Sequence, residues 1–245
     1  MSNTPPTSDI IHDFSDLPEN LDDYFYVSAP RDNRSGKGKS ANIGIGAPER
    51  VRYVQTPRVF CPFGVEKAKQ AESTYETIKM LITIRSEAKG AVDFLRLCEA
   101  ADKAVINAAF KNQTEWFGTP EKDYKSLEII ADRYFPLVKQ RAPYDPQITA
   151  KIDEASTRVF SKGTAGGAPE RIEDVLSVQA KTTMRVILRF GPAWAAGGRF
   201  GLQVRADQIL VVAEGGMSLK RDIFEKLQVV DDEDDTENKP PGDEN

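Results

Sequence analysis

Alternation of apolar and polar positions is the clearest pattern along the chain, and it predicts a mainly β protein. Residues 75–84 form the clearest predicted strand, in which apolar side chains at 78, 80, 82 and 84 alternate with Lys79, Leu81 and Thr83. Residues 183–190 repeat the pattern, and after a Gly/Ala-rich loop at 191–198 a second strand is expected over 199–212. We therefore expect a hairpin with one core face and one partly basic face turned toward phosphate.

The period changes to three and four in the middle of the chain, which indicates an amphipathic helix over residues 91–112. The apolar positions that set this period are Phe94, Cys98, Ala101, Val105 and Ala108. Ser126 is expected to cap a second, shorter helix that stops before Pro136. Together these helices predict a helical insertion over about 88–135.

Shorter strands are expected on both sides of this insertion. Residues 24–27 and 51–60 have strand composition, the latter interrupted by Pro57, and a strand pair is expected within 148–160. Residues 31–46 are rich in Gly and basic side chains, and we expect a mobile loop there. In total, the sequence predicts five or six strands with one helical insertion.

Charge divides the chain into a basic body and two acidic ends. Residues 1–26 carry six carboxylates and no Lys or Arg, residues 231–245 carry a net charge of -7, and the total of -5 therefore leaves +8 for residues 27–230. We expect a flexible acidic leader at 1–23, a single domain at 24–230 and a disordered acidic tail at 231–245. This segregation favours a protein that binds a polyanion and regulates its own affinity for it, although acidic ends can also serve solubility alone.

Several classes of protein are disfavoured. No apolar run approaches the roughly 18 residues of a membrane span, and the first residues lack a secretory signal, so an intracellular protein is expected. Cys61 and Cys98 lie 37 residues apart without CxxC spacing, which predicts reduced, buried thiols rather than a disulfide or zinc site.

Catalytic equipment is also missing from the sequence. Gly38-Lys39-Ser40 resembles the end of a phosphate-binding P-loop, but Asn33 stands where its first Gly belongs and no helix follows. His12 is the only histidine and falls in the expected leader, which argues against a catalytic triad or a histidine metal site. We predict a protein that is not an enzyme and uses neither cofactor nor metal.

Basic side chains interleaved with aromatic ones favour binding of single-stranded nucleic acid, because cations track the phosphates and aromatic faces stack on bases. Strand aromatics usually pack inward, which favours core positions for Tyr53 and Phe60. Trp116 and Phe117 are also expected in the core, and the basic loop can equally be a solvated linker. Trp194 has small neighbours that offer it little packing. The candidate contacts are Arg31, Arg34, Lys37, Lys39, Arg50, Arg52, Tyr53, Arg58, Phe60, Arg185, Arg189, Trp194, Arg199, Phe200 and Arg205.

Two segments carry a resemblance to a known family. Residues 181–212, which include Arg-Phe-Gly-Pro-Ala-Trp at 189–194, are followed by an acidic tail and look like the end of the single-stranded DNA-binding proteins of short-tailed phages and their relatives in giant DNA viruses. The stretch Thr56-Pro57 with Cys61-Pro62-Phe63-Gly64-Val65 is similar to the viral branch.

The resemblance implies an OB-like β-barrel with an inserted helix, no cofactor, and a C-terminal tail that competes with DNA and docks replication partners. The tail's acidic run is Asp231, Asp232, Glu233, Asp234 and Asp235. Phage members typically end in an aromatic residue that contributes to docking, whereas this chain ends in Asp243-Glu244-Asn245, so that docking device is in doubt.

The sequence therefore leads to one main hypothesis: a non-catalytic single-stranded DNA-binding protein of replication, recombination or repair, of viral type. Its expected partners are single-stranded DNA, with RNA left open, and replication proteins bound through the tail. No membrane partner is expected, a homodimer is left open, and if the protein is viral its site is the host nucleus or a cytoplasmic replication site. The alternatives are a structural or virion-associated interaction protein that does not bind nucleic acid, and a hydrolase that uses only carboxylates.

Overall fold

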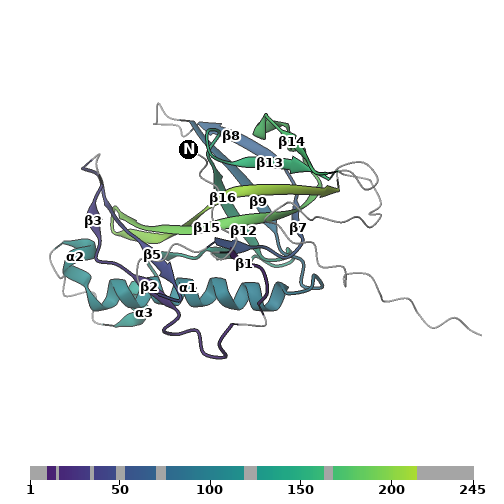
Figure 1. Ribbon diagram of the computed structural model, residues 1–245. Coiled ribbons are helices and arrows are strands. Elements are labelled where there is room, and N and C mark those ends of the chain that lie inside the picture. Colours follow the sequence, from purple (N-terminus) through teal and green to yellow (C-terminus); the bar gives the residue numbers. More distant parts are fainter. Residues whose placement is uncertain are drawn as a thin grey trace, which may run out of the picture.

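The computed structural model describes residues 10–14, 17–33, 36–47, 53–69, 76–118, 126–162 and 168–213. Within these ranges the protein is mainly β with helices inserted between its strands, as the hydrophobic pattern predicts, although there are three α-helices rather than two. Figure 1 shows the sheet curling above a long helix that runs along one side of it.

The described residues form sixteen strands rather than the five or six expected, because many strands have only two or three residues and carry no readable alternation. The longer predicted elements keep most of their expected bounds. The strands are β1 (Ile10–Ile11), β2 (Phe25–Val27), β3 (Arg31–Asp32), β4 (Lys39–Ala41), β5 (Ile43–Ile45), β6 (Tyr53–Gln55), β7 (Val59–Cys61), β8 (Val65–Lys69), β9 (Glu76–Thr83), β10 (Tyr134–Phe135), β11 (Val138–Lys139), β12 (Gln147–Ile152), β13 (Arg158–Ser161), β14 (Glu170–Ile172), β15 (Thr182–Ala196) and β16 (Arg199–Ala213). The helices are α1 (Ala91–Lys111), α2 (Gln113–Phe117), α3 (Leu127–Ala131) and a short 3₁₀ turn at Val175–Ser177.

Five strands form a ring at the centre of the fold. β15, β7, β9, β12 and β16 pair in succession, and direct pairing of β15 with β16 joins the two ends. Only one residue pair, Phe60 with Thr83, links β7 to β9, so the sheet is ring-like without completing a barrel. Inward-facing side chains such as Met80, Ile148 and Leu188 fill the ring and are fully buried.

The β15–β16 hairpin is longer than the ring, and its outer part extends as an arm toward β3 and α2 (Figure 1). Residues 191–196, expected in a loop, are strand because β4 pairs with one side of β15 and β16 with the other. The turn itself comprises only Gly197 and Gly198, both at positive φ.

Residues 31–46 also differ from the mobile loop predicted by their Gly content. Their described part contains β3, β4 and β5, since β4 adds to the hairpin arm and β5 pairs with β2. Neighbouring strands supply hydrogen-bond partners that a sequence pattern of this kind does not reveal.

Helix α1 buries its apolar stripe against the sheet, with Phe94, Leu97 and Val105 fully enclosed. Asp102 on α1 accepts hydrogen bonds from the Tyr134 hydroxyl at 2.6 Å and the Leu137 amide at 2.9 Å, which tie the helix to β10. Ser126 caps α3 as predicted, its hydroxyl accepting from the Ile129 amide.

Both cysteines are free and buried, in agreement with the sequence analysis. Burial raises the pKa of the Cys61 thiol to about 11 and places that of Cys98 well above its ordinary value. A thiol in such surroundings stays protonated and packs as a small apolar side chain.

The N-terminal segment corrects the expectation of a flexible leader at residues 1–23. In its described part, β1 pairs in parallel with β6, and Phe14, Leu17 and Leu21 are buried. The Phe14 ring packs edge-on against Phe94 of α1 at 5.9 Å between centroids. Five apolar side chains spaced through an acidic stretch therefore suffice to hold it on the folded body, and they bring His12 beside Gln55.

Candidate nucleic-acid interface

Strand register places four cations in one row across the polar outer face of the ring. Arg189 of β15 lies opposite Arg205 of β16, Arg205 opposite Lys151 of β12, and Lys151 opposite Lys79 of β9. Each is at least partly exposed, whereas neighbours of opposite parity, such as Val204, point into the core. At a strand spacing of about 4.8 Å, this basic row spans roughly 14 Å.

Three arginines converge on one open pocket at the end of this row, which we call the basic groove. Its volume is about 620 Å³, and Arg31, Arg189 and Arg205 are its only charged lining residues within the described chain. Ser40 and Asn42 add polar groups to the lining. The remaining lining residues are Ile43, Phe190, Gly191 and Pro192. A groove with cations and hydrogen-bond donors but no lining carboxylate is suited to an anion.

One carboxylate stands near the groove without lining it. Asp207 lies two residues beyond Arg205 on β16, and its Oδ1 is 3.6 Å from Nε of Arg189. Burial raises the pKa of Asp207, and Arg189 and Arg205 counteract this effect while Asp153 adds to it. Asp207 thus partly neutralises Arg189 in the unliganded protein.

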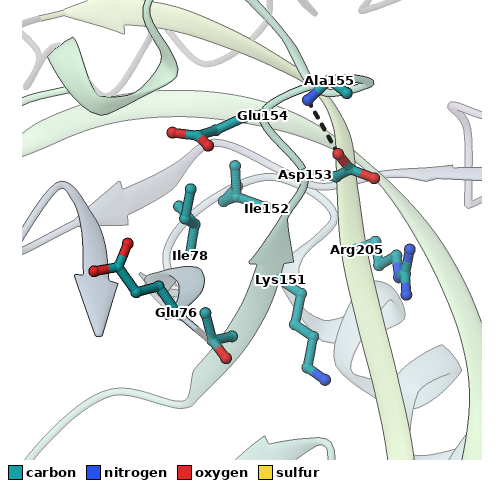
Figure 2. A pocket seen from close by; sticks show the side chains of 9 residues that line it. Glu76, Ile78, Lys151, Ile152, Asp153, Glu154, Ala155 and Arg205 are labelled. Carbon is teal, nitrogen blue, oxygen red and sulfur yellow. Dashed lines mark hydrogen bonds between the residues drawn. The ribbon is translucent and has the colours of Figure 1, made fainter. Parts of the chain in front are cut away.

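A second pocket adjoins the basic groove through Arg205, which lines both. It has a volume of about 430 Å³, and Figure 2 shows Lys151 and Arg205 on neighbouring strands, with Glu76 and Glu154 toward its other side. Lys67 bridges these two carboxylates, at 3.2 Å from Glu76 and 3.8 Å from Glu154. Burial and the nearby charge of Arg205 lower the pKa of Lys151, which fits two cations held close together.

The hairpin arm carries an aromatic pair on the same outer face. Trp194 of β15 and Phe135 of β10 flank Gly201 of β16, which is cross-strand neighbour to both, and their ring centroids are 5.8 Å apart. The guanidinium of Arg199 lies 5.2 Å above the Phe135 ring. Trp194 therefore does not project from a loop, as the sequence suggested, but is half-buried in a strand.

Two predicted contacts are wrong because their side chains are enclosed. Phe200 is fully buried, where its ring packs against Trp116, Phe117 and Tyr134. Arg185 is only 3% exposed, on the same face of β15 as Ile187, which is itself buried in an apolar cluster with Ile10. Neither side chain reaches a ligand at the surface of this fold.

The other predicted residues are spread over the surface. Lys37 is exposed, Lys39 forms a 3.6 Å ion pair with Asp32, and Arg58 is half-buried between β6 and β7. Tyr53 is the cross-strand neighbour of Arg189, and Phe60 has the Arg85 guanidinium 4.9 Å above its ring. Arg34, Arg50, Arg52 and the tail residues 231–235 lie outside the described residues.

Sequence reasoning missed Lys79, Lys151 and Phe135. Lys79 and Lys151 each occupy a polar position of an alternating strand, so their outward direction was readable from the pattern. Their alignment with Arg205 and Arg189 depends on register between strands far apart in sequence, which the pattern does not fix. Phe135 lies in a two-residue strand that carries no periodic signal.

Two searches of the described residues gave negative results. No group of three or more His, Cys, Asp or Glu side chains lies close enough together to hold a metal ion. No helix in the described part of the chain is long and apolar enough to cross a membrane.

Comparison with known proteins gave structural similarities only. No protein-family model and no curated protein matches the chain. The single-stranded DNA-binding protein from bacteriophage Enc34, in complex with single-stranded DNA, is similar over 78% of this chain and 97% of its own, with 8% identity and a TM-score of 0.44. Gp2.5, a single-stranded DNA-binding protein encoded by bacteriophage T7, is similar over 74% of this chain and 100% of its own, with 10% identity and a TM-score of 0.48.

Both structures come from phage single-stranded DNA-binding proteins, the kind of protein that the sequence resembles. Because identity and TM-score are low, we base the functional proposal on the groove itself.

Proposed function

We propose that the chain is a non-catalytic single-stranded DNA-binding protein that acts in DNA replication, recombination or repair. The observation that carries the proposal is the convergence of Arg31, Arg189 and Arg205 on one groove without a lining carboxylate. These residues come from three separate strands, so the fold rather than local sequence brings them together.

The basic row supports a polyanion as the ligand rather than a single small anion. Like charges directly opposite each other in a sheet destabilise it, and this row places Arg189, Arg205, Lys151 and Lys79 side by side. A chain of phosphates crossing the row neutralises successive cations and releases the counterions condensed on the nucleic acid. Such contacts read no bases, so we expect weak sequence preference.

The acidic tail is the proposed regulator of this site. Residues 231–245 hold eight carboxylates against one lysine, a charge opposite to that of the groove. We propose that the tail competes with DNA for the groove and, when displaced, is available to replication proteins.

The test is fluorescence anisotropy of a labelled single-stranded oligonucleotide titrated with the full chain between about 50 and 200 mM salt. Tight binding that weakens steeply with salt is expected, with a log–log slope near −3 if about four phosphates are contacted at about 0.7 each. The double variant Arg189→Gln/Arg205→Gln is expected to bind weakly and with a shallower slope.

Lys103→Gln is the matched control, because Lys103 is a cation on α1 outside both pockets and paired with Glu99. It should bind as the unmodified chain does. No binding at the lowest salt would overturn the proposal and favour a structural protein that assembles through apolar surfaces, whose association does not fall with salt.

A further inference from the structure

The hairpin arm carries features that phosphate binding leaves unexplained. Phe135 is 44% exposed although its ring belongs to an aromatic pair, and Trp194 beside it is half-buried. Aromatic rings of a folded protein usually complete such contacts inside the core, as Phe200 does on the opposite face of the same arm. An open aromatic pair on a polar face is typical of a binding surface.

The register explains how the pair is held open. Trp194, Gly201 and Phe135 are successive cross-strand neighbours on β15, β16 and β10. A Cβ at Gly201 would come within 3.1 Å of the Trp194 ring and 3.2 Å of the Phe135 side chain. The lack of a side chain at Gly201 therefore leaves the two rings space to tilt toward each other, at 31° between their planes.

Cations flank this pair on both sides. Arg199 stacks over Phe135, and on the Trp194 side the same row continues through Ser40 to Arg31, which lines the basic groove. Arg199 is exposed, so its guanidinium is able to leave the ring and cover another flat group. A flat, aromatic ligand attached to phosphates matches this combination.

We propose that Phe135, Trp194 and Arg199 form a subsite for one unpaired nucleobase, and that this subsite makes the protein prefer single-stranded over double-stranded DNA. The inference rests on the proposed function, because the base is delivered by a strand whose phosphates occupy the basic groove. A base stacked on Phe135 and Trp194 gains contacts that a paired base, enclosed within a duplex, cannot offer.

The distance to the groove suits one continuous strand. Arg199 and Arg205 lie on the same face of β16 six residues apart, which is about 20 Å at about 3.3 Å per residue. A bound strand of a few nucleotides covers this path, in the range of about 4 to 16 nucleotides that such folds bind.

The test uses Trp194 as its own reporter, since Trp116 is the only other tryptophan and is 2% exposed. Single-stranded DNA, an abasic oligonucleotide of equal length and a duplex are each titrated while intrinsic fluorescence and anisotropy are followed. Fluorescence is expected to fall with single-stranded DNA and to stay constant with the abasic strand. In Trp194→Phe the binding persists and the fluorescence change is lost.

Phe135→Leu and Trp194→Leu are expected to bind single-stranded DNA about tenfold more weakly and to bind the abasic strand unchanged, as loss of one stacked base implies. Their preference for single-stranded over duplex DNA falls by the same factor. Phe63→Leu is the control, because Phe63 is 60% exposed but lies in the turn between β7 and β8. Thermal unfolding verifies that each variant is folded. If Trp194→Leu does not fold, Trp194→Phe still tests the subsite.

Two failures are distinguishable. If both leucine variants keep the full preference for single strands while Arg189→Gln/Arg205→Gln loses binding, the base subsite is refuted and the proposed function stands. If the unmodified chain binds neither the natural nor the abasic strand at low salt, the proposed function fails and the subsite with it.

Discussion

Arg189 and Arg205 lie directly opposite each other in the β15–β16 ladder, and both side chains line the basic groove. Two like charges in cross-strand register repel, and Asp207, 3.6 Å from Arg189, partly offsets this repulsion. The repulsion between Arg189 and Arg205 is therefore expected to lower the stability of the fold, and a bound anion would offset it.

Removing one of these charges should weaken DNA binding without lowering the stability of the fold. Arg205→Gln is expected to leave the thermal unfolding temperature unchanged or raise it slightly, because the repulsion with Arg189 and Lys151 is lost. The same variant should bind single-stranded DNA more weakly, with a salt slope reduced by about 0.7 for one lost phosphate contact. Differential scanning calorimetry and salt-dependent anisotropy measure the two effects, and a variant that is both less stable and equally tight in binding contradicts the prediction.

Asp207 should act as an internal competitor of the ligand. Because burial raises its pKa, Asp207 takes up a proton at a higher pH than an ordinary aspartate, and Arg189 then loses its carboxylate neighbour. Affinity for DNA is therefore expected to rise as pH is lowered and Asp207 becomes protonated. Asp207→Asn should bind more tightly than the unmodified chain at pH 7 and lose this part of the pH dependence. Equal pH profiles for the two proteins would refute this role of Asp207.

Asp102 should make stability pH-dependent by itself. Burial raises its pKa to about 6, against the hydrogen bonds from Tyr134 and Leu137 that lower it. A group whose pKa is higher in the folded state than in the unfolded state contributes stability at low pH, and this contribution is lost as pH rises through about 6.

Asp102→Asn tests this contribution, because an amide keeps an acceptor for Leu137 and can donate to the Tyr134 oxygen without ionising. Urea unfolding between pH 4.5 and 7.5 should show a smaller fall in stability with rising pH for the variant than for the unmodified chain. A parallel fall in both proteins would assign the pH dependence to other groups.

The sequence predicts the framework of this fold better than its site. Periodic segments such as residues 76–83 and 91–111 were found because each buries one face, so their side-chain pattern is set by the core. Residues 191–196 of the hairpin arm are strand where the sequence predicts a loop, because these Gly- and Ala-rich residues are held by pairing with β4 and β16 rather than by propensity.

The site depends on contacts between distant segments. Arg31, Arg189 and Arg205 were all identified as cations, but their meeting in one groove results from three-dimensional strand order. Phe200 and Arg185 differ from the prediction for a related reason: α2 and β10 cover Phe200, and Arg185 is enclosed on the outer face of β15. Alternation defines two faces of a strand and does not say what covers each face.

Gly38 should control how Arg31 is presented to the groove. It has a φ of 79° in the β3–β4 turn, and a Cβ there would overlap the Ala195 carbonyl oxygen of β15. Gly36 in the same turn also has positive φ, but a Cβ there meets no atom within 4 Å.

Both alanine variants therefore carry the roughly 1–2 kcal/mol penalty of a left-handed residue, while only Gly38→Ala must also move the turn away from the arm. Gly38→Ala is expected to weaken DNA binding more than Gly36→Ala, as measured by anisotropy. Equal affinities of the two variants would show that the position of β3 does not matter for binding.

The acidic tail gives the last prediction, which concerns residues beyond the described part of the chain. A version ending at Val230 loses a net charge of -7 that we propose competes for the basic groove. It should bind single-stranded DNA more tightly at low salt, and the difference should shrink as salt rises because screening weakens the competition. A full-length variant in which residues 231–235 are changed to Asn or Gln keeps the length of the tail and removes five of its charges. If that variant binds as weakly as the unmodified chain while the truncated version binds tightly, the tail blocks the groove by bulk rather than by charge.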